Sequence, residues 1–397
     1  MADTVLEPSA PAAGPTPGRE GGATLGRAAA EQQEAFAGRL FEAALGALDL
    51  FAVYLGDRLG LYRALADGGP ATPAELAARA GVHERYAREW LEQQAVTDVL
   101  EVADPDPDPA GRRYRLPAGR AGVLLDEESP AYLAPVARFL VAEAGQAPAL
   151  LRAYRTGGGV PYAAYGADAR EAQAAFNRPA FAHLLADRWL PALPDVHARL
   201  RAAPPARVAD VGCGAGWASI ALARAFPAAR IDGFDADAAS VALAQRNAAA
   251  AGVADRVAFR TLDVSAPATP GRADADAGGY DLVLAFETVH DLARPVEALA
   301  TMRRLARPGG AVLVAEHRVG EAFAAPGDPI ERLSYGISLL FCLPAGMADG
   351  TPERPAAGTG TVLRPATLRR YARAAGFRDA EVLPIEHDLF RFYRLRS

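Results

Sequence analysis

The segment from Arg207 to Trp217, which reads RVADVGCGAGW, constrains the fold more than any other part of the chain. Its first residues are mostly apolar, as in a buried parallel strand, and the helical pattern ASIALARAF follows its end. Between these two parts lie three glycines within five residues, which let the backbone turn sharply and let a ligand approach without meeting a Cβ atom. The segment therefore predicts a strand, a ligand-binding glycine turn and a helix.

The spacing of the glycines indicates which kind of ligand the turn binds. A dinucleotide fingerprint, G-x-G-x-x-G, that begins at Gly212 needs a glycine at position 217, where this chain has Trp217. A bulky indole at the helix N-terminus, where a pyrophosphate would bind, favours a ligand without phosphates. S-adenosylmethionine (SAM) is such a ligand.

Three acidic residues lie at corresponding places beside predicted strands. Asp210 precedes the glycine turn, Asp235 ends a second strand in ARIDGFDAD, and Asp263 follows a third strand in VAFRTLDV. A carboxylate about 20 residues after the glycine turn suits a bidentate grip on a ribose diol. A fourth strand in YDLVLAFETVHD and a fifth strand after the turn PGG continue the alternation of strands and helices.

This order of motifs resembles that of the class I SAM-dependent methyltransferases. The resemblance implies an α/β fold, with a Rossmann-like seven-stranded methyltransferase sheet over residues 206–397, and SAM as the cofactor. The last two strands, near AEVLPI and LFRFYRL, are close enough in sequence to be antiparallel neighbours. The residues expected to bind the cofactor lie at or beside the strand ends, apart from one tyrosine in the preceding segment: Asp210, Gly212, Gly214, Gly216, Asp235, Ala236, Asp263, Val264, Phe286 and Tyr165. Tyr162 and Asn177 of the same preceding segment could also reach the cofactor.

Residues 35–130 carry the pattern of a winged helix. A long apolar helical region begins at Leu40, the segment TPAE from Thr72 reads as a capping box, and HERYAREWLEQQAV predicts the next helix. The segments VLEV and RYRL then predict a two-stranded wing. Because the apolar helix has more surface than one small domain covers, we expect an α-helical winged-helix dimerisation domain and a homodimer. Residues 1–30 are expected to form a disordered tail and residues 131–205 a helical linker.

Net charge helps to decide between DNA binding and dimerisation for this domain. Residues 31–130 carry 18 acidic residues against 10 arginines, whereas contact with phosphates needs a positive surface. We therefore expect no nucleic-acid partner. A SAM-binding transcriptional regulator that acts through its winged helix stays open as an alternative.

Composition excludes several other classes of protein. All 42 basic residues are arginine, so no lysine is present for a Schiff base, a P-loop or general-base catalysis. The two cysteines cannot form a disulfide framework, and neither a signal peptide nor an apolar run of about 18 residues is visible. We expect a cytoplasmic protein without membrane contact.

The candidate catalytic residues, His290 and Asp291, follow the fourth strand in FETVHDLARP, at the sheet edge where ligands bind. The pair resembles the His-Asp pair of plant-type small-molecule O-methyltransferases, which also carry a winged-helix dimerisation domain. The segments HD, GTGTVLRP and ARAAGF resemble those of actinobacterial winged-helix methyltransferases. The resemblance implies methyl transfer to a small molecule, at a hydroxyl of a secondary metabolite, with His290 as general base and Asp291 or another carboxylate orienting its ring. C- or N-methylation, and a His290 that only orders the loop, stay open as alternatives.

An insertion at residues 319–361 follows the fifth strand and predicts a cap over a substrate pocket. Two residues are candidates for binding the substrate: Tyr335 within this cap, and Glu316 at the end of the fifth strand. Glu316 and His317 could instead hold a divalent metal together with Asp291. A metal ion is not expected, because no compact group of oxygen ligands is visible in the sequence.

Overall fold

The computed structural model describes residues 26–106, 108–266 and 279–397. Residues 1–25 of the tail expected over residues 1–30 lie outside the described residues. Helix α1 (Arg27–Arg58) begins within the last residues that were predicted to belong to this tail. Packing divides the chain into a unit that ends at Asp49 and a unit from Leu50 to Ser397. Among the described residues, no helix is both long and apolar enough to cross a membrane.

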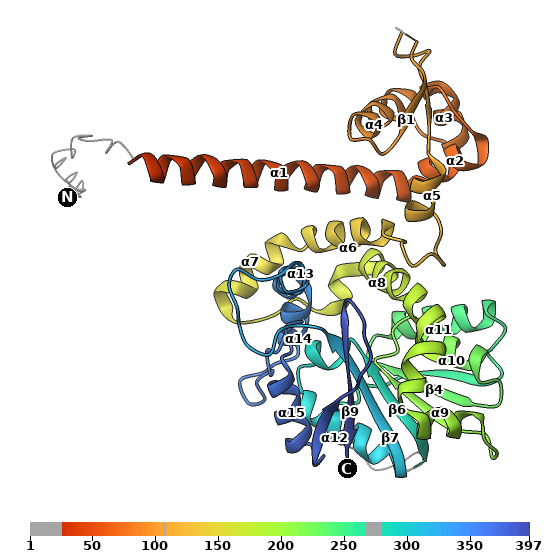
Figure 1. The fold of residues 1–397 in the computed structure, drawn as a ribbon, viewed down its shortest axis with the longest axis vertical. Helices are drawn as coiled ribbons and strands as arrows, with labels where there is room; N and C mark the ends of the chain where they lie inside the picture. The colour runs from red at the N-terminus through yellow and green to blue at the C-terminus, as the bar shows by residue number, and fades with distance from the viewer. Residues whose placement is uncertain (1–25, 107, 267–278) are drawn as a thin grey trace, which may run out of the picture. The chain divides into compact units, whose positions relative to one another are not determined.

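The winged helix has the predicted order of elements (Figure 1). The capping box is confirmed, because the Thr72 hydroxyl accepts a hydrogen bond from the Glu75 N–H and the Glu75 carboxylate accepts one from the Thr72 N–H. Gly81 follows in the left-handed conformation and ends that helix. The wing is antiparallel, as expected. After α1 come α2 (Leu61–Gly68), α3 (Pro73–Ala80), α4 (Glu84–Val96), β1 (Glu101–Asp104), β2 (Arg113–Arg115) and α5 (Ala118–Leu124).

Helix α1 carries large apolar side chains on its surface. They recur at helical spacing along one side of the helix, and each is between 41% and 64% exposed. A monomer rarely keeps so long an apolar row in water. The side chains are Phe36, Leu40, Phe41, Leu45, Leu48, Phe51 and Leu55.

The segment between the winged helix and the large sheet is helical. Its elements are α6 (Ala134–Ala144), α7 (Ala147–Thr156), η1 (Tyr162–Tyr165), α8 (Gly166–Ala180), the π-helix η2 (Phe181–Trp189), η3 (Leu190–Ala192) and α9 (Pro194–Arg201).

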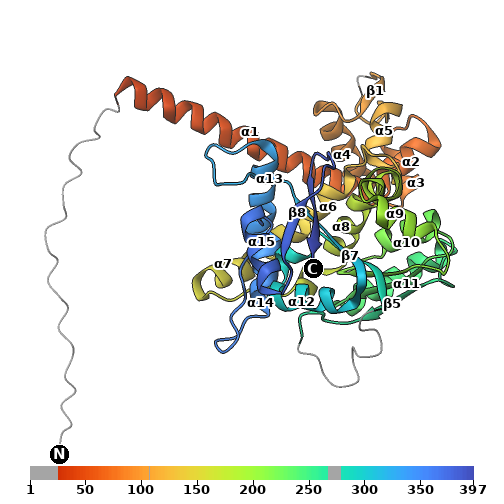
Figure 2. The same cartoon turned by 60° about the horizontal axis from the view of Figure 1, so that its bottom comes forward.

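The large sheet has seven strands in the order β5-β4-β3-β6-β7-β9-β8, so β5 and β8 are its edges (Figure 2). The strands β3 to β7 pair in parallel with one another, whereas β9 runs antiparallel to β7. The last two strands, β8 and β9, are antiparallel neighbours, as predicted. The strand order reverses at β3, which lies between β4 and β6. Ligands of such sheets bind outside the carboxyl ends of the strands at this switch point. The strands are β3 (Arg207–Val211), β4 (Arg230–Asp235), β5 (Val257–Thr261), β6 (Tyr280–Phe286), β7 (Ala306–His317), β8 (Asp379–Val382) and β9 (Phe390–Arg396).

Helices cover both faces of this sheet (Figures 1 and 2). One face packs against α9, α10 (Trp217–Ala225) and α11 (Ala238–Ala250), and the other packs against α12 (Pro295–Leu305) and α15 (Pro365–Ala374). All residues of β6 are buried, because both of its faces are covered. The remaining elements lie after β6 and in the insertion: η4 (Val289–Asp291), α13 (Pro329–Ile337), the π-helix η5 (Ser338–Cys342) and α14 (Leu343–Ala348).

Candidate active site

Two glycines of the turn are required by its own packing. Gly212 and Gly216 adopt the left-handed conformation, with φ of 69° and 82°. A Cβ atom on Gly212 would lie 2.3 Å from the Thr288 hydroxyl oxygen, and one on Gly216 would lie 2.5 Å from the Phe259 ring. Gly216 is the N-cap of α10 and does not line the cavity described below. Its predicted contact with the cofactor is therefore corrected to a structural role.

Gly214, between these two glycines, faces open space. Its φ is 51°, and no described atom outside its own neighbourhood lies within 4 Å of the place of a Cβ. Its N–H donates a hydrogen bond of 2.9 Å to Oδ2 of Asp235. Oδ1 of Asp235 accepts a second hydrogen bond, of 2.8 Å, from the N–H of Asp237. The end of β4 is thus tied to the turn, and the space beside Gly214 belongs to a cavity.

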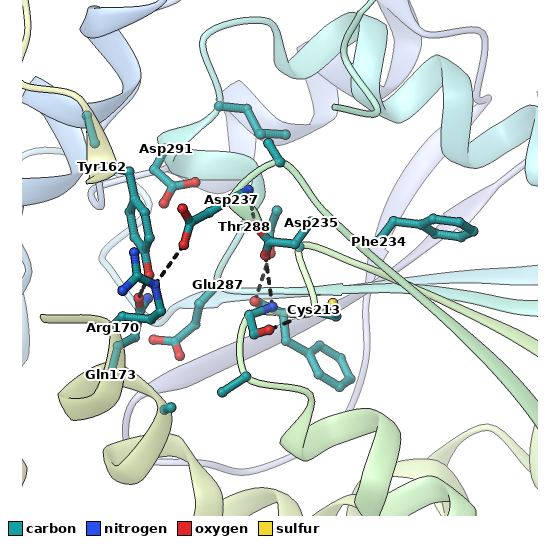
Figure 3. A pocket seen from close by; sticks show the side chains of 18 of the residues that line it. Tyr162, Arg170, Gln173, Cys213, Phe234, Asp235, Asp237, Glu287, Thr288 and Asp291 are labelled. Carbon is teal, nitrogen blue, oxygen red and sulfur yellow. Dashed lines mark hydrogen bonds and ion pairs between the residues drawn. The ribbon is translucent and has the colours of Figure 1, made fainter. Parts of the chain in front are cut away.

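This cavity, of about 420 Å³, lies at the carboxyl ends of β3, β4 and β6 (Figure 3). Its volume is in the range of small-molecule sites. The insertion also contributes to its wall, through Ala345, Ala348 and Asp349. Most residues predicted for the site line it: Asp210, Gly212, Gly214, Asp235, Ala236, Asp263, Val264, Phe286 and Asp291.

Two desolvated carboxyl groups make part of the cavity wall acidic. Burial raises the pKa of Asp210 to about 7, although a hydrogen bond of 2.7 Å from the Ser219 hydroxyl opposes this shift. Burial also raises the pKa of Asp235, against the backbone hydrogen bonds that lower it. A nearby positive charge favours the ionised form of such groups. The wall therefore suits a ligand that carries a cation, as SAM does in its sulfonium.

Of the two tyrosines expected to reach the cofactor, Tyr162 lines the cavity and Tyr165 does not (Figure 3). The Tyr165 hydroxyl donates a hydrogen bond of 2.7 Å to the Leu340 carbonyl, and its ring packs edge-on against Phe341, with centroids 4.6 Å apart. The predicted cofactor contact of Tyr165 is thus corrected. The sequence YAAYG offers two tyrosines three positions apart, and packing against η5 decides which of them enters the core.

Glu287 lines the cavity but was not predicted from the sequence. It follows β6 directly, with a φ of 51° that is uncommon for a residue with a side chain. One carboxylate oxygen lies 3.2 Å from Nε2 of His317, and the other accepts a hydrogen bond from Nδ2 of Asn177 in α8. Burial raises the pKa of Glu287, but His317 and Asn177 outweigh burial and the net shift is downward. An acid directly after a predicted strand was the signal that could have identified it.

His290 is paired with Glu316, not with Asp291. Nδ1 of His290 lies 2.5 Å from Oε2 of Glu316, whose Oε1 accepts a hydrogen bond of 2.9 Å from the Val289 N–H. Burial lowers the pKa of His290, but the Glu316 carboxylate outweighs burial and raises that pKa well above its usual value. Glu316 is fully buried and does not line the cavity. Its predicted contact with the substrate is corrected to the positioning of His290.

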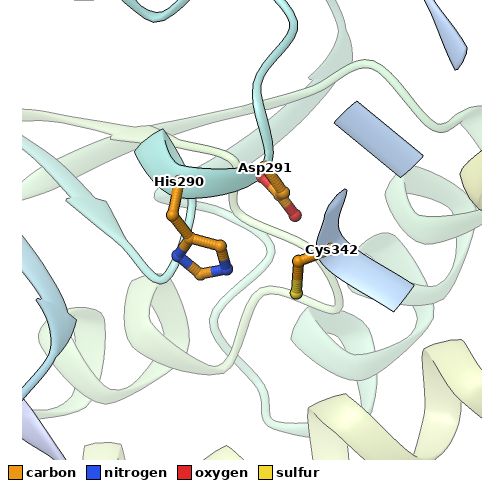
Figure 4. A group of neighbouring side chains, drawn as sticks. All are labelled: His290, Asp291 and Cys342. Carbon is orange, nitrogen blue, oxygen red and sulfur yellow. The ribbon is translucent and has the colours of Figure 1, made fainter. Parts of the chain in front are cut away.

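Three side chains meet beside the cavity: His290, Asp291 and Cys342 of η5 (Figure 4). One nitrogen, oxygen or sulfur atom from each lies within 4.8 Å of those of the other two. Of the three, only Asp291 lines the cavity, and burial raises its pKa to about 7. Burial also raises the pKa of Cys342, although contact with His290 opposes this shift.

Tyr335 lies away from this group. It is 39% exposed, and its hydroxyl accepts a hydrogen bond of 3.3 Å from Nη2 of Arg364. The buried side of α13 carries Glu331 and Ser334, so Tyr335 turns outward. Its predicted contact with the substrate is corrected for this reason.

Methyl transfer from a sulfonium needs alignment of donor and acceptor and exclusion of water, rather than a nucleophilic side chain. The cavity beside the open glycine turn has room for a donor and an acceptor. Residues 204–333 match the family model of a methyltransferase domain, and residues 46–125 match that of an Rv2258c-like winged HTH domain. The chain is a SAM-dependent methyltransferase with an N-terminal winged-helix domain, and SAM is its cofactor.

Individual relatives agree with this class. The chain is 26% identical over 204 residues to the ubiquinone biosynthesis O-methyltransferase of Burkholderia pseudomallei. The matched residues make up 51% of this chain and 77% of that protein. The solved structure of the mitomycin 7-O-methyltransferase MmcR matches with a TM-score of 0.65 at 21% identity, over 93% of this chain and 99% of that one. The N,N-8-amino-8-demethyl-D-riboflavin dimethyltransferase of Streptomyces davawensis matches with a TM-score of 0.58 at 22% identity, over 91% and 99%. At these identities the two structures establish the fold.

Proposed function

We propose that this enzyme transfers the methyl group of SAM to a hydroxyl group of a small molecule of secondary metabolism. The buried pair of His290 and Glu316 beside the cavity carries the proposal, because a hydroxyl acceptor benefits from a base and this pair supplies one. The names of the mitomycin and ubiquinone relatives also place their reactions at oxygen.

For the cofactor, we propose that Asp235 accepts hydrogen bonds from the ribose hydroxyls of SAM. Asp235 lies at the end of β4 and lines the cavity. The open side of Gly214 lets the ligand lie against the turn, since a side chain there would occupy that space. Asp210, Asp263, Val264 and Phe286 complete the wall on the same side of the sheet.

In the proposed reaction the acceptor oxygen attacks the methyl carbon while the bond from that carbon to sulfur breaks. The hydroxyl proton passes to Nε2 of neutral His290, and the cofactor leaves as a neutral thioether. Glu316 holds the Nδ1–H, fixes the tautomer of the ring and stabilises the imidazolium that forms. His290 does not line the cavity itself, whereas Asp291 does, so the acceptor hydroxyl has to reach Nε2 past Asp291.

The test is incubation of the full chain with methyl-labelled SAM and a metabolite extract, followed by mass spectrometry. We expect a labelled methyl ether. His290→Ala should keep its SAM affinity in calorimetry and lose turnover by ~10²–10⁴-fold. His183→Ala is the matched control, since His183 is exposed and outside the cavity. A His290→Ala enzyme with near wild-type turnover would contradict the base assignment.

Methylation of nitrogen is the second candidate, because the riboflavin-derived dimethyltransferase with the same fold acts on an amino group by its name. A neutral amine attacks without prior loss of a proton, so its methylation depends less on a base. A labelled N-methyl product whose formation survives His290→Ala would support this candidate over the first.

We also propose a homodimer that forms through α1. The exposed apolar side chains of α1 from Phe36 to Leu48 belong to the first unit. In the second unit, an apolar hollow of about 500 Å³ is lined by Leu55, Leu59, Tyr86 and Trp90 among others. A cytoplasmic location is proposed because Cys213 and Cys342 are both free thiols. The acidic balance of the winged helix argues against nucleic acid as its partner.

A further inference from the structure

The group of His290, Asp291 and Cys342 combines the three kinds of side-chain atom that bind transition metals. An imidazole nitrogen, a carboxylate oxygen and a thiol sulfur lie within 4.8 Å of one another. Glu316 occupies Nδ1 of His290, so Nε2 is the nitrogen that faces Asp291 and Cys342 (Figure 4). The proposed methyl transfer uses His290 and leaves Cys342 without a role.

The surroundings of His290 match those of a histidine that binds a metal. Such a histidine donates its second ring N–H to a carboxylate, which fixes the tautomer and the orientation of the ring. Glu316 is in that position, and it is itself held by the Val289 N–H. Both side chains are buried, so the ring is held in place before any ligand binds.

We propose that His290, Asp291 and Cys342 bind Zn²⁺, and that the bound ion stops methyl transfer. Mixed nitrogen, sulfur and oxygen ligands favour zinc, whereas Mg²⁺ and Ca²⁺ take oxygen ligands. Three protein ligands leave the fourth coordination position of a tetrahedral zinc ion free. Because Asp291 lines the cavity, we expect this position to face the cavity.

The geometry needs only a small adjustment. Zinc bonds of 2.0–2.3 Å place tetrahedral ligand atoms about 3.5 Å apart, so the three atoms, which lie within 4.8 Å of one another, have to approach by up to about 1.3 Å. Cys342 ends η5, a π-helical segment, and such segments occur often at functional sites. Binding of the ion releases the thiol proton of Cys342, and Nε2 of His290 then coordinates the ion. With Nε2 occupied, His290 cannot accept the acceptor proton. This inhibitory step rests on the proposed function, whereas metal binding does not.

Cobalt gives a direct test of binding, because Co²⁺ bound to a thiolate absorbs light through charge transfer from sulfur. The metal-free full chain is titrated with Co²⁺ and then with Zn²⁺ as competitor. We expect one ion per chain, a thiolate band that Zn²⁺ removes, and a band absent from Cys342→Ser. Cys213→Ser, which changes the other cysteine of the chain, should keep the band. Glu316→Gln should weaken Zn²⁺ binding about 10–100-fold.

The outcomes separate the two parts of the proposal. A wild-type chain without a thiolate band, or a band that persists in a Cys342→Ser variant with normal SAM affinity, overturns the metal site. Zn²⁺ should inhibit the wild type at concentrations that fill the site, a chelator should reverse the inhibition, and Cys342→Ser should resist it. Zinc that binds without inhibiting overturns the inhibitory step alone. If no acceptor is methylated, the proposed function fails while the cobalt titration still decides the metal site.

Discussion

Replacement of Glu316 by glutamine tests whether the buried pair sets the basicity of His290. Glutamine keeps the size of the side chain and an oxygen that can accept a hydrogen bond from Nδ1–H, but it removes the charge 2.5 Å from the ring. An opposite charge in contact shifts a pKa by about 1–3 units, and each unit corresponds to about 1.4 kcal/mol. Without that charge, burial still lowers the pKa of His290, and contact with Cys342 is left to oppose burial.

The sign of the pH effect follows from the role of the base. His290 must be neutral to accept a proton, so wild-type turnover is lost as the pH falls through its raised pKa, above the ordinary value of about 6.5. In Glu316→Gln this loss should move to lower pH by about 1–3 units. The plateau at high pH should also fall, because a weaker base is less effective and its charged form is no longer stabilised. Initial rates at saturating SAM and acceptor, from about pH 5 to about pH 10, measure both effects around the ordinary histidine value.

Glu143→Gln is the matched control for the loss of a buried carboxyl group. Glu143 is fully buried in α6, and among the described residues neither of its carboxylate oxygens has a hydrogen-bond partner. Its pH profile should follow the wild type. A Glu316→Gln enzyme with the wild-type profile and plateau would refute the reasoning, because the pair would then have no influence on the reacting proton.

Three further predictions concern the cofactor, the assembly and stability. Asp235→Ala should weaken SAM binding roughly tenfold or more in calorimetry, and an unchanged affinity would remove the ribose assignment. Phe41→Glu combined with Leu48→Glu should convert a dimer to a monomer in light scattering, and a wild-type monomer at micromolar concentration would count against the dimer. Burial raises the pKa of Glu143 to about 8 in the folded protein, whereas the unfolded chain loses this proton at lower pH. The free energy of unfolding therefore falls as the pH rises towards about 8. Glu143→Gln should therefore stabilise the fold by about 1–3 kcal/mol, with a larger gain in melting temperature near pH 8 than near pH 5, and equal gains at the two pH values would refute this.

Local chemistry made several features predictable from the sequence alone. The glycine turn, the capping box at Thr72 and the acids at the strand ends follow from backbone conformation and hydrogen bonds between residues close in sequence. The alternation of apolar strands with amphipathic helices likewise predicted a doubly wound α/β sheet, because each element has to bury its apolar side. The resemblance to class I SAM-dependent methyltransferases implied its seven strands, which the structure has. The parallel order of the strands then brings their carboxyl ends to one edge, where most of the residues predicted to bind the cofactor line one cavity.

Tertiary structure decided which side chain pairs with which. Asp291, next to His290 in sequence, was the natural candidate for its partner, but Glu316 from the neighbouring strand β7 holds the ring. Tyr162 lines the cavity in place of Tyr165, and Cys342 reaches His290 from an insertion far along the chain. Sequence periodicity can say which side of a helix is apolar, but it cannot say which distant element packs there. Contacts between such elements depend on how the whole chain fills its interior, and that packing sets the surroundings of the reacting groups.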